Sequence, residues 1–250
     1  MSGQLSVIGL GPGDAALLTP QAAAALAAAS DLFGYAPYLA RVPKHPGQRR
    51  HASDNREELA RARAALDCAA AGGRVAVVSG GDAGVFGMAA AVCEAIEAGP
   101  ASFRALPLAV VPGVSALLAV AARVGAPLGG DFCAISLSDN LKPWPVVTQR
   151  LAAAAAAGFV IALYNPASRA RPWQLGAAFA VLRAHLPPTT TVVFAAAVTR
   201  PDEHVVITTL AEADGTPADM RTLILVGTAA TRRIARDGAP PLLYTPRSVA

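Results

Sequence analysis

The sequence predicts an α/β protein made of two α/β domains, with a mainly parallel sheet in the first domain and a mixed sheet in the second. In the first half of the chain, short apolar runs alternate with alanine-rich segments that are long enough for helices. Such alternation is typical of a parallel sheet covered by helices. In the second half, the strand candidates at residues 191–197, 204–210 and 222–227 follow one another in succession. This succession favours antiparallel neighbours.

The composition indicates a folded protein with a substantial core. The chain has 250 residues, of which 54% are hydrophobic and 15% charged, and its net charge is +4. This size and composition suit one or two domains and exclude a disordered chain. The longest uncharged run, residues 105–122, contains Pro107, Pro112 and Gly113, so it predicts a strand, a turn and a helix rather than a membrane span. We place the domain boundary here, between residues 1–113 and 114–250.

The cysteines and histidines form no recognisable metal site or disulfide framework. The three cysteines are scattered, and the four histidines lack metal-ligand spacing. We therefore expect no bound metal. The N-terminal segment has no basic region ahead of an apolar stretch, so we expect no signal peptide and a cytoplasmic protein without a membrane partner.

A first glycine-rich loop follows the predicted strand at residues 5–10. Its spacing only partly matches a dinucleotide-binding loop, because Asp14 stands where the third glycine is needed. Thr19 and Pro20 predict a helix with Thr19 as its N-cap, well past the glycines. A pyrophosphate could not use that helix N-terminus in the usual way. We therefore expect a loop that a ligand other than NAD approaches.

A second glycine-rich loop, Ser79-Gly80-Gly81-Asp82, separates an apolar strand at residues 75–78 from a helix at about residues 85–96. Open α/β sheets bind ligands at the carboxyl ends of their strands, where such turns expose backbone N–H groups. Asp82 can accept hydrogen bonds from a ligand. It can equally cap the helix that follows, and both interpretations stay open.

A basic segment follows the short strand expected at residues 30–33. We expect residues 34–55 to be irregular and residues 56–71 to form a helix that ends at two glycines. Arginine binds carboxylates in a bidentate way, so this segment is a candidate site for a planar anionic ligand. The alternative is a solvated loop and helix face. The side chains expected at the ligand are Tyr35, Tyr38, Arg41, Lys44, Arg49 and Arg50.

The remaining elements continue the alternation. We expect strands at residues 108–111, 132–137 and 159–164, with helices at residues 115–124, 144–157 and 173–185. Polar turns follow two of these strands, at Ser138-Asp139-Asn140 and at residues 165–171. Turns in this position lie at the edge of the sheet where ligands bind.

Three motifs taken together resemble those of the tetrapyrrole methylases, the S-adenosylmethionine-dependent enzymes of corrin and sirohaem synthesis. The motifs are Val7-Ile8-Gly9-Leu10-Gly11-Pro12-Gly13-Asp14, then Ser79-Gly80-Gly81-Asp82, and then Val111-Pro112-Gly113-Val114-Ser115-Ala116. Each motif alone is weakly specific, but the resemblance in order and spacing covers the whole chain. It implies two α/β domains that hold S-adenosylmethionine in the cleft between them. It also implies that the product is S-adenosylhomocysteine and that the protein is a homodimer.

Two further stretches resemble one branch of the family, whose members methylate a ring carbon of a corrin precursor and contract the macrocycle. They are residues 129–139 with Pro143-Trp144, and residues 163–169 with Arg171. The chain departs from many relatives at Ala83, where they have proline, and this change should leave the turn less rigid. The implied substrate is a carboxylate-rich tetrapyrrole, with no nucleic acid as partner.

The resemblance also implies roles for particular residues. The expected cofactor contacts are Pro12, Gly80, Gly81, Asp82, Ser115, Ala116, Tyr164 and Asn165. Arg169 and Arg171 are expected to join the basic segment in binding substrate carboxylates. Asp139, Ser138 and Asp131 are candidates for acid–base or ring-positioning roles, and turn or cap chemistry is the alternative for all three.

Other functions stay open at this point. An NAD(P)-dependent oxidoreductase could use the first glycine loop. A basic nucleic-acid-binding module could use residues 41–63 and would bind in a salt-dependent way, although that region lacks an aromatic platform. Within the family, the enzyme could act on another ring carbon or on a cobalt-bearing substrate, and no residue decides between these possibilities.

Overall fold

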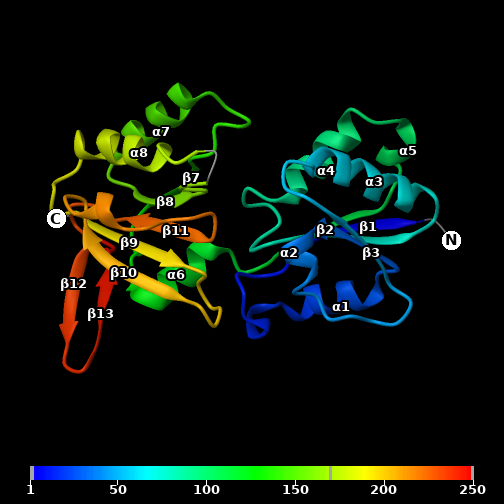
Figure 1. Cartoon of the computed structure of the whole chain (residues 1–250), viewed down its shortest axis with the longest axis horizontal. Helices are drawn as coiled ribbons and strands as arrows, with labels where there is room; N and C mark the ends of the chain where they lie inside the picture. Colours follow the sequence, from blue (N-terminus) through cyan, green and yellow to red (C-terminus); the bar gives the residue numbers. More distant parts are fainter. Residues whose placement is uncertain (1–2, 169–170, 249–250) are drawn as a thin grey trace. The chain divides into compact units, whose positions relative to one another are not determined.

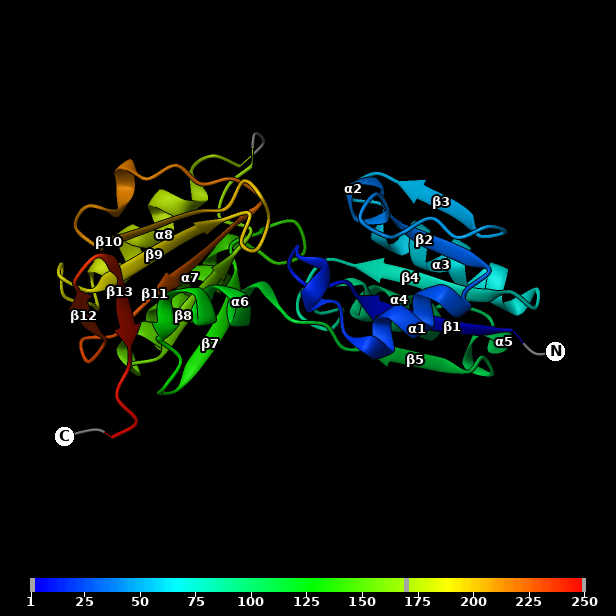
Figure 2. The same ribbon diagram turned by 90° about the horizontal axis from the view of Figure 1, so that it is seen from below.

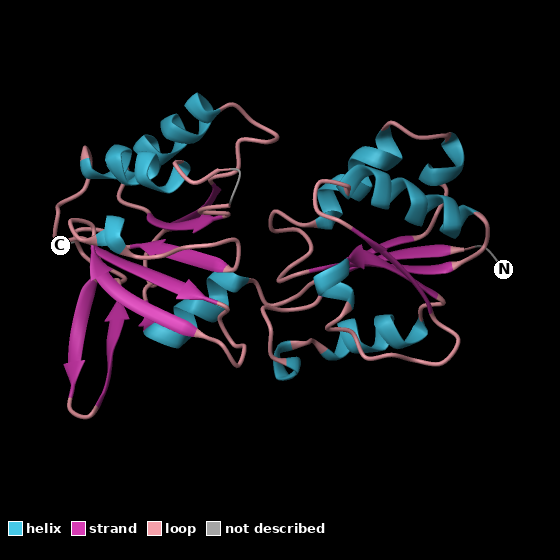
Figure 3. Ribbon diagram, in the orientation of Figure 1, coloured by secondary structure: helices cyan, strands magenta, loops and turns pink. Residues whose placement is uncertain are grey.

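The computed structural model describes residues 3–168 and 171–248. The chain divides into two compact units, Met1–Ala116 and Leu117–Ala250 (Figure 1). Both units contain helices and strands (Figure 3). Within the described ranges, no helix has the length and apolar character needed to cross a membrane.

The first unit is built on a five-stranded sheet in the order β3-β2-β4-β1-β5 (Figure 2). All neighbouring strands in it are parallel, which confirms the parallel sheet predicted for this half of the chain. Its strands are β1 (Gln4–Gly9), β2 (Asp31–Tyr35), β3 (Arg49–Ser53), β4 (Arg74–Ser79) and β5 (Leu108–Val111).

Helices cover both faces of this sheet. Helices α1 (Pro20–Ala28) and α2 (Ala36–Leu39) lie on one face, and α3 (Glu58–Ala70), α4 (Met88–Glu97) and α5 (Ala101–Arg104) lie on the other (Figure 1). A short 3-10 helix, η1 (Ala15–Leu17), precedes α1. The predicted start of α1 is confirmed, because Thr19 Oγ1 accepts a hydrogen bond from the Ala22 N–H at 3.1 Å. The chain leaves β1 toward one face and β4 toward the other, so these adjacent strands form a topological switch point.

The second unit contains a mixed five-stranded sheet in the order β10-β9-β11-β8-β7. Strands β7 and β8 are parallel, while the β8–β11, β11–β9 and β9–β10 pairs are antiparallel, as predicted for the second half. The strands are β7 (Phe132–Ser136), β8 (Val160–Tyr164), β9 (Thr191–Ala196), β10 (His204–Thr209) and β11 (Thr222–Val226). The helices are α6 (Ala116–Val124), α7 (Trp144–Ala156), α8 (Gln174–Arg183) and the 3-10 helix η2 (Ala213–Gly215).

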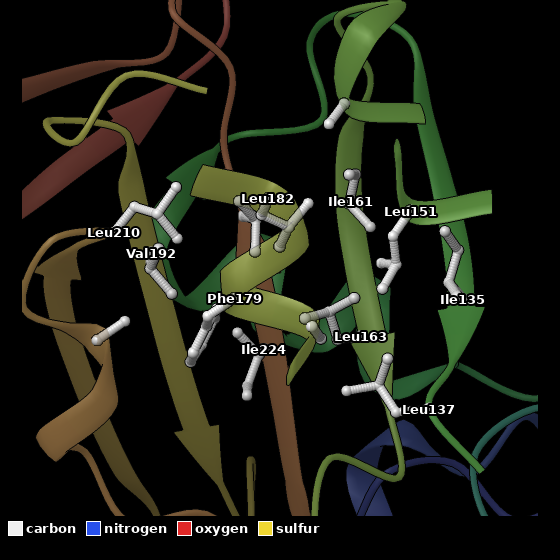
Figure 4. Close-up of a cluster of buried hydrophobic side chains, with 14 of the residues drawn as sticks. Ile135, Leu137, Leu151, Ile161, Leu163, Phe179, Leu182, Val192, Leu210 and Ile224 are labelled. Atoms are coloured by element: carbon white, nitrogen blue, oxygen red, sulfur yellow. The ribbon is translucent and has the colours of Figure 1, made fainter. Parts of the chain in front are cut away.

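Helices α7 and α8 bury their apolar sides against one face of this sheet (Figure 4). Leu151 of α7 and Phe179 of α8 pack in one cluster with Leu163 of β8 and Ile224 of β11, and each is at most 1% exposed. Fully burying a side chain of this size stabilises the fold by roughly 1.5–3 kcal/mol. This packing holds the carboxyl ends of β7 and β8 in place.

Two parts of the fold differ from the sequence-based expectation. Residues 34–55 were expected to be irregular, but they contain α2 and the edge strand β3, in which Arg49 pairs with Asp31 of β2. The polar sequence of β3 has no apolar alternation, and its contacts with β2 stabilise it instead. The hairpin of β12 (Arg232–Arg236) and β13 (Ala239–Tyr244), which joins β6 (Gly125–Ala126) in a separate three-stranded sheet, was not expected either.

Candidate functional site

The three glycine-rich loops meet at one end of the first sheet. Strands β4, β1 and β5 are adjacent and parallel, so the loops that follow them leave the same edge. Gly11 and Gly81 exchange two backbone hydrogen bonds of 3.0 and 2.9 Å, and the Leu10 N–H donates to the Ser79 carbonyl at 2.9 Å. The first and second loops are therefore joined directly across the switch point.

The glycines in these loops are needed because the loops pack against one another. A Cβ atom added to Gly9 would lie 2.7 Å from the Gly113 nitrogen and 2.8 Å from the Gly81 oxygen. A Cβ atom on Gly113 would meet the same Gly81 oxygen. Gly11 and Gly81 also adopt left-handed backbone conformations, with φ of +70° and +65°. The glycines were expected to let a ligand approach the backbone, and these contacts show that packing between the loops also requires them.

Asp82 joins the second loop to the third. Its Oδ2 accepts a hydrogen bond from the Gly113 N–H at 2.9 Å, and its Oδ1 accepts one from the Gly84 N–H at 2.8 Å. The interpretation of Asp82 as a helix cap is wrong, because α4 begins only at Met88 and has no side-chain cap at Gly87. Ser79 Oγ instead accepts from the Met88 N–H at 3.3 Å.

The structure brings six of the predicted cofactor residues to this end of the sheet, on the three loops. They are Pro12, Gly80, Gly81, Asp82, Ser115 and Ala116. Ser115 is 6% exposed, and a Cβ atom on Gly81 would lie 3.7 Å from the Ala116 nitrogen. The donors and acceptors here are mostly backbone groups, joined by one carboxylate.

An aromatic pair borders the second loop. The rings of Tyr35 and Tyr38 meet edge to face with centroids 5.4 Å apart. A Cβ atom on Gly80 would lie 2.7 Å from Tyr38 Cζ, so Gly80 allows the Tyr38 ring to lie against the loop. Arg41 Nη2 donates to the carbonyls of Leu10 and Gly11 at 3.2 and 2.8 Å and thereby supports the first loop.

The other basic residues of this segment make different contacts from those of Arg41. Arg50 donates three hydrogen bonds of 2.6 to 2.9 Å to backbone carbonyls at residues 39, 42 and 43. Arg49 lies at the amino end of β3, paired with Asp31. Lys44 is exposed. The basic segment is therefore used largely to hold its own chain, which its composition did not indicate.

Asp31 is a fully buried carboxylate with three side-chain partners. Arg49 Nε lies 2.8 Å from its Oδ1, His51 Nε2 lies 2.9 Å from the same atom, and Ser30 Oγ donates to Oδ2 at 2.8 Å. Burial by itself would raise the pKa of Asp31, but the hydrogen bonds from Arg49, His51 and Ser30 hold the pKa well below its usual range. The His51 ring also stacks on Phe33 with centroids 4.1 Å apart.

Arg61, one of the basic residues of this region, is a buried cation whose structural role the sequence did not indicate. Its Nε donates to Ser53 Oγ at 2.6 Å, its Nη2 donates to the Asp54 carbonyl at 2.7 Å, and its Nη1 lies 3.3 Å from Met88 Sδ. Burial lowers the pKa of Arg61. Arg61 thus links the end of β3 to the start of α4. Its place inside an alanine-rich helical segment carries no signal of this role.

Side chains organise the corresponding strand ends in the second unit. Ser136 Oγ, at the end of β7, accepts hydrogen bonds from Asn165 Nδ2 at 2.9 Å and from the Ser138 N–H at 3.2 Å. Asn165 has a φ of +53°, a conformation that asparagine tolerates well. Tyr164 Oη accepts from the Leu117 N–H at 3.1 Å, near the start of α6. Ser136 was not predicted, although a serine that ends an apolar strand was a usable signal.

The three residues predicted for acid–base roles are separated. Ser138 and Asp139 follow the carboxyl end of β7, where Asp139 lies near Arg171 and Gln174. Asp131 is exposed at the amino end of β7, and a five-residue strand spans about 17 Å. Asp131 therefore does not share a site with the other two. Arg169 lies outside the described residues.

The described part of the chain contains no group of three His, Cys, Asp or Glu side chains able to hold a metal. All three cysteines are free. Burial raises the pKa of the Cys133 thiol and, together with Asp31, that of the Cys68 thiol. These thiols are therefore less ionised than free cysteine.

Comparison with known proteins gives a consistent result. The profile of the family described as Tetrapyrrole (Corrin/Porphyrin) Methylases matches residues 4–214. The chain is 60% identical to a precorrin-3B C(17)-methyltransferase of Sinorhizobium sp over 250 residues, covering 100% of this chain and 98% of that one. It is 41% identical to a probable cobalt-factor III C(17)-methyltransferase of Salmonella typhimurium, covering 97% and 98% of the two chains.

Solved structures of methyltransferases are similar to this chain. The crystal structure of the methyltransferase CobJ superposes with a TM-score of 0.92 at 49% identity, covering 98% of this chain and all of that one. Uroporphyrin-III C-methyl transferase from Thermus thermophilus, complexed with S-adenyl homocysteine, gives a TM-score of 0.68 at 23% identity over 90% and 92% of the two chains, which shows the fold alone. This chain belongs to the tetrapyrrole methylase family.

Proposed function

We propose that the chain transfers the methyl group of S-adenosylmethionine to C17 of precorrin-3B in cobalamin biosynthesis. The observation that carries this proposal is the 60% identity to the Sinorhizobium precorrin-3B C(17)-methyltransferase along the whole chain. The two stretches near residues 129–139 and 163–171, which resemble the same branch of the family, support it.

The first unit fits S-adenosylmethionine better than a dinucleotide. Helix α1 begins at Pro20, after η1, so its N-terminus does not follow the first glycines. The loops instead carry backbone groups and the partly exposed Asp82 carboxylate, whose oxygens can accept more than the one backbone hydrogen bond that each already receives, and these groups suit the hydroxyl and amino groups of this cationic cofactor. We propose Pro12, Gly80, Gly81, Asp82, Ser115 and Ala116 as contacts, with Tyr164 and Asn165 from the second unit.

The task of the chain is mainly to orient the reactants. Bound S-adenosylmethionine supplies a methyl group already activated by the positive sulfonium, so no nucleophilic side chain is required. Holding donor and acceptor in line is worth about 7–11 kcal/mol of barrier. The loops of the first unit are suited to this because their backbones are bonded to one another.

Ring contraction to precorrin-4 is a further part of the proposal. The proton transfers that contraction needs are assigned to Asp139 and Ser138, which lie together at the end of β7. Asp131 is left out because it lies at the other end of that strand. We also propose that the enzyme is cytoplasmic and forms a homodimer, and light scattering on the purified protein tests the dimer.

The experiment is incubation with labelled S-adenosylmethionine and precorrin-3B, with the product identified by mass spectrometry and NMR. We expect one added methyl group at C17 together with a contracted ring. A product methylated at another carbon would contradict the proposed position, and methylation without contraction would refute the second step. Calorimetry should show binding of S-adenosylhomocysteine and none of NAD(P).

The cobalt-bearing substrate is the second candidate. It is supported by the 41% identity to the probable cobalt-factor III C(17)-methyltransferase over nearly the full length of both chains. Parallel assays with the two substrates decide between them, and we expect a higher kcat/KM for the metal-free ring.

A further inference from the structure

Three polar side chains form a loosely bonded cluster at the carboxyl ends of β7 and β8. Asp139 follows β7, and Arg171 and Gln174 belong to the segment that follows β8. Gln174 Nε2 donates to Asp139 Oδ2 at 3.3 Å, and Arg171 Nη1 lies 3.8 Å from Asp139 Oδ1. The first distance is long for a hydrogen bond and the second is beyond one. The cluster is therefore able to rearrange around a ligand.

Two buried atoms of this cluster have no hydrogen-bond partner among the described residues. They are Nε of Arg171 and Oε1 of Gln174. Gln174 is 1% exposed as a residue, and the Arg171 side chain is 12% exposed. Buried polar atoms are nearly always hydrogen-bonded in native proteins, and those that are not call for an explanation. Arg171 needs an acceptor here, and Gln174 needs a donor.

The charges at this cluster select the kind of partner. The family resemblance implied a substrate carboxylate as the partner of Arg171. Arg171 and Gln174 both lie against the Asp139 carboxylate, so a carboxylate bound to Arg171 would lie near a second negative charge, and it would have no proton to donate to Gln174 Oε1. Like charges in a partly buried site repel strongly. A neutral group that both accepts and donates, such as a hydroxyl, satisfies both atoms without that repulsion.

We propose that Arg171 and Gln174 bind a neutral hydrogen-bonding group of the tetrapyrrole substrate, which accepts from Arg171 Nε and donates to Gln174 Oε1. This makes Gln174 a specificity-determining residue. The inference rests on the proposed function, because it takes precorrin-3B as the substrate. A site that hydrogen-bonds such a group discriminates against analogues that lack it.

Exposed apolar side chains beside the cluster suit the face of a macrocycle. Trp173, which precedes Gln174 at the start of α8, is 50% exposed, and Met220, whose sulfur lies 4.0 Å from Arg171 Nη2, is 43% exposed. Trp173 is held by an edge-to-face contact with Trp144, with centroids 4.9 Å apart. Apolar surface around a few polar groups is the usual make-up of small-molecule sites.

The main test replaces Gln174 by methionine, which keeps the length of the side chain and removes its polar atoms. Precorrin-3B binding is followed by difference absorbance in the presence of S-adenosylhomocysteine. We expect the affinity to fall about 30-fold, with a matching rise in KM. The midpoint of thermal unfolding should change little, because the variant removes a buried unbonded oxygen along with the long hydrogen bond from Nε2 to Asp139. Gln149→Met on the exposed side of α7 is the matched control and should bind like the wild type.

A second variant tests the same inference if Gln174→Met does not fold. Arg171→Lys keeps the positive charge but removes Nε, and we expect the same loss of precorrin-3B affinity with unchanged binding of S-adenosylhomocysteine. If folded Gln174→Met and Arg171→Lys both bind precorrin-3B like the wild type, the two atoms hold only water or nothing, and the inference is overturned.

Asp139→Asn tests whether the bound group is neutral. If it were a carboxylate, removing the charge of Asp139 would tighten precorrin-3B binding. We expect no gain, and a gain of about tenfold or more would overturn the assignment. A wild-type enzyme that fails to methylate precorrin-3B would refute the proposed function instead, so the two failures are distinguishable.

Discussion

The strand ends of the two units are held in different ways. In the first unit, backbone groups join the first two loops through the paired hydrogen bonds between Gly11 and Gly81, and the Asp82 carboxylate binds the backbone of the third loop. In the second unit, side chains such as Ser136 and Asn165 make the connections, and the nearby Gln174 retains an unbonded oxygen. Backbone contacts leave no space for a Cβ atom, whereas side-chain contacts can exchange partners when a ligand arrives. The first arrangement suits fixed positioning, and the second suits recognition of a variable substrate group.

The largest effect should come from crowding the backbone contacts. Gly113→Ala would place a Cβ atom against the Gly81 oxygen and 2.8 Å from the Gly9 carbonyl carbon. We expect the free energy of unfolding to fall by about 3 kcal/mol, as measured by urea denaturation, with loss of S-adenosylhomocysteine binding. Gly176→Ala in α8, where no atom lies within 4 Å, is the control and should be neutral or stabilising. Equal free energies of unfolding for Gly113→Ala and Gly176→Ala would contradict the view that close backbone contacts hold the loops of the first unit.

A smaller effect should follow from releasing one connection between the loops. Asp82→Ala removes the acceptor for the N–H groups of Gly84 and Gly113. We expect a loss of about 2 kcal/mol in unfolding free energy and weaker S-adenosylhomocysteine binding by calorimetry, measured where the variant is folded. Asp82→Asn keeps one acceptor, so it should lose less unfolding free energy and less S-adenosylhomocysteine affinity than Asp82→Ala. Unchanged affinity of the folded variant, together with the expected loss of unfolding free energy, would restrict Asp82 to a structural role.

The smallest effect concerns Asp31 and the pH. Because the pKa of Asp31 is lower in the folded chain than in the unfolded chain, its contribution is fully present above the unfolded value of about 3.9. That contribution is lost as the pH falls below this value toward the folded pKa.

Asp31→Asn should therefore lower stability near pH 7, by about 1 kcal/mol because Arg49 and His51 are partly solvated. The difference from the wild type should shrink on acidification below about pH 4. Denaturation curves of both proteins at several pH values measure this difference in unfolding free energy. A constant difference would show that Asp31 acts through packing rather than charge.

The sequence predicted the strands and helices that have a strong local signal. The start of α1 is marked by Thr19 and Pro20, and the paired β1 and β4 are marked by apolar runs that end in glycine. The edge strand β3 was missed because its stability comes from Arg49 and His51 contacting Asp31, which lies in another strand. The exposed strand β12 has no buried face, so no apolar alternation marks it.

By itself, the sequence determined the α/β class, the order of the three glycine loops and the family, because these depend on local periodicity and motif spacing. Tertiary structure decided the partners of the polar groups. It showed that Asp82 holds Gly113, that Arg49 neutralises a buried acid, and that Asp131 lies away from Asp139. It also placed Gln174 against Asp139 across 35 positions of sequence. Hydrogen bonds and ion pairs between distant segments depend on strand order, which no local pattern encodes.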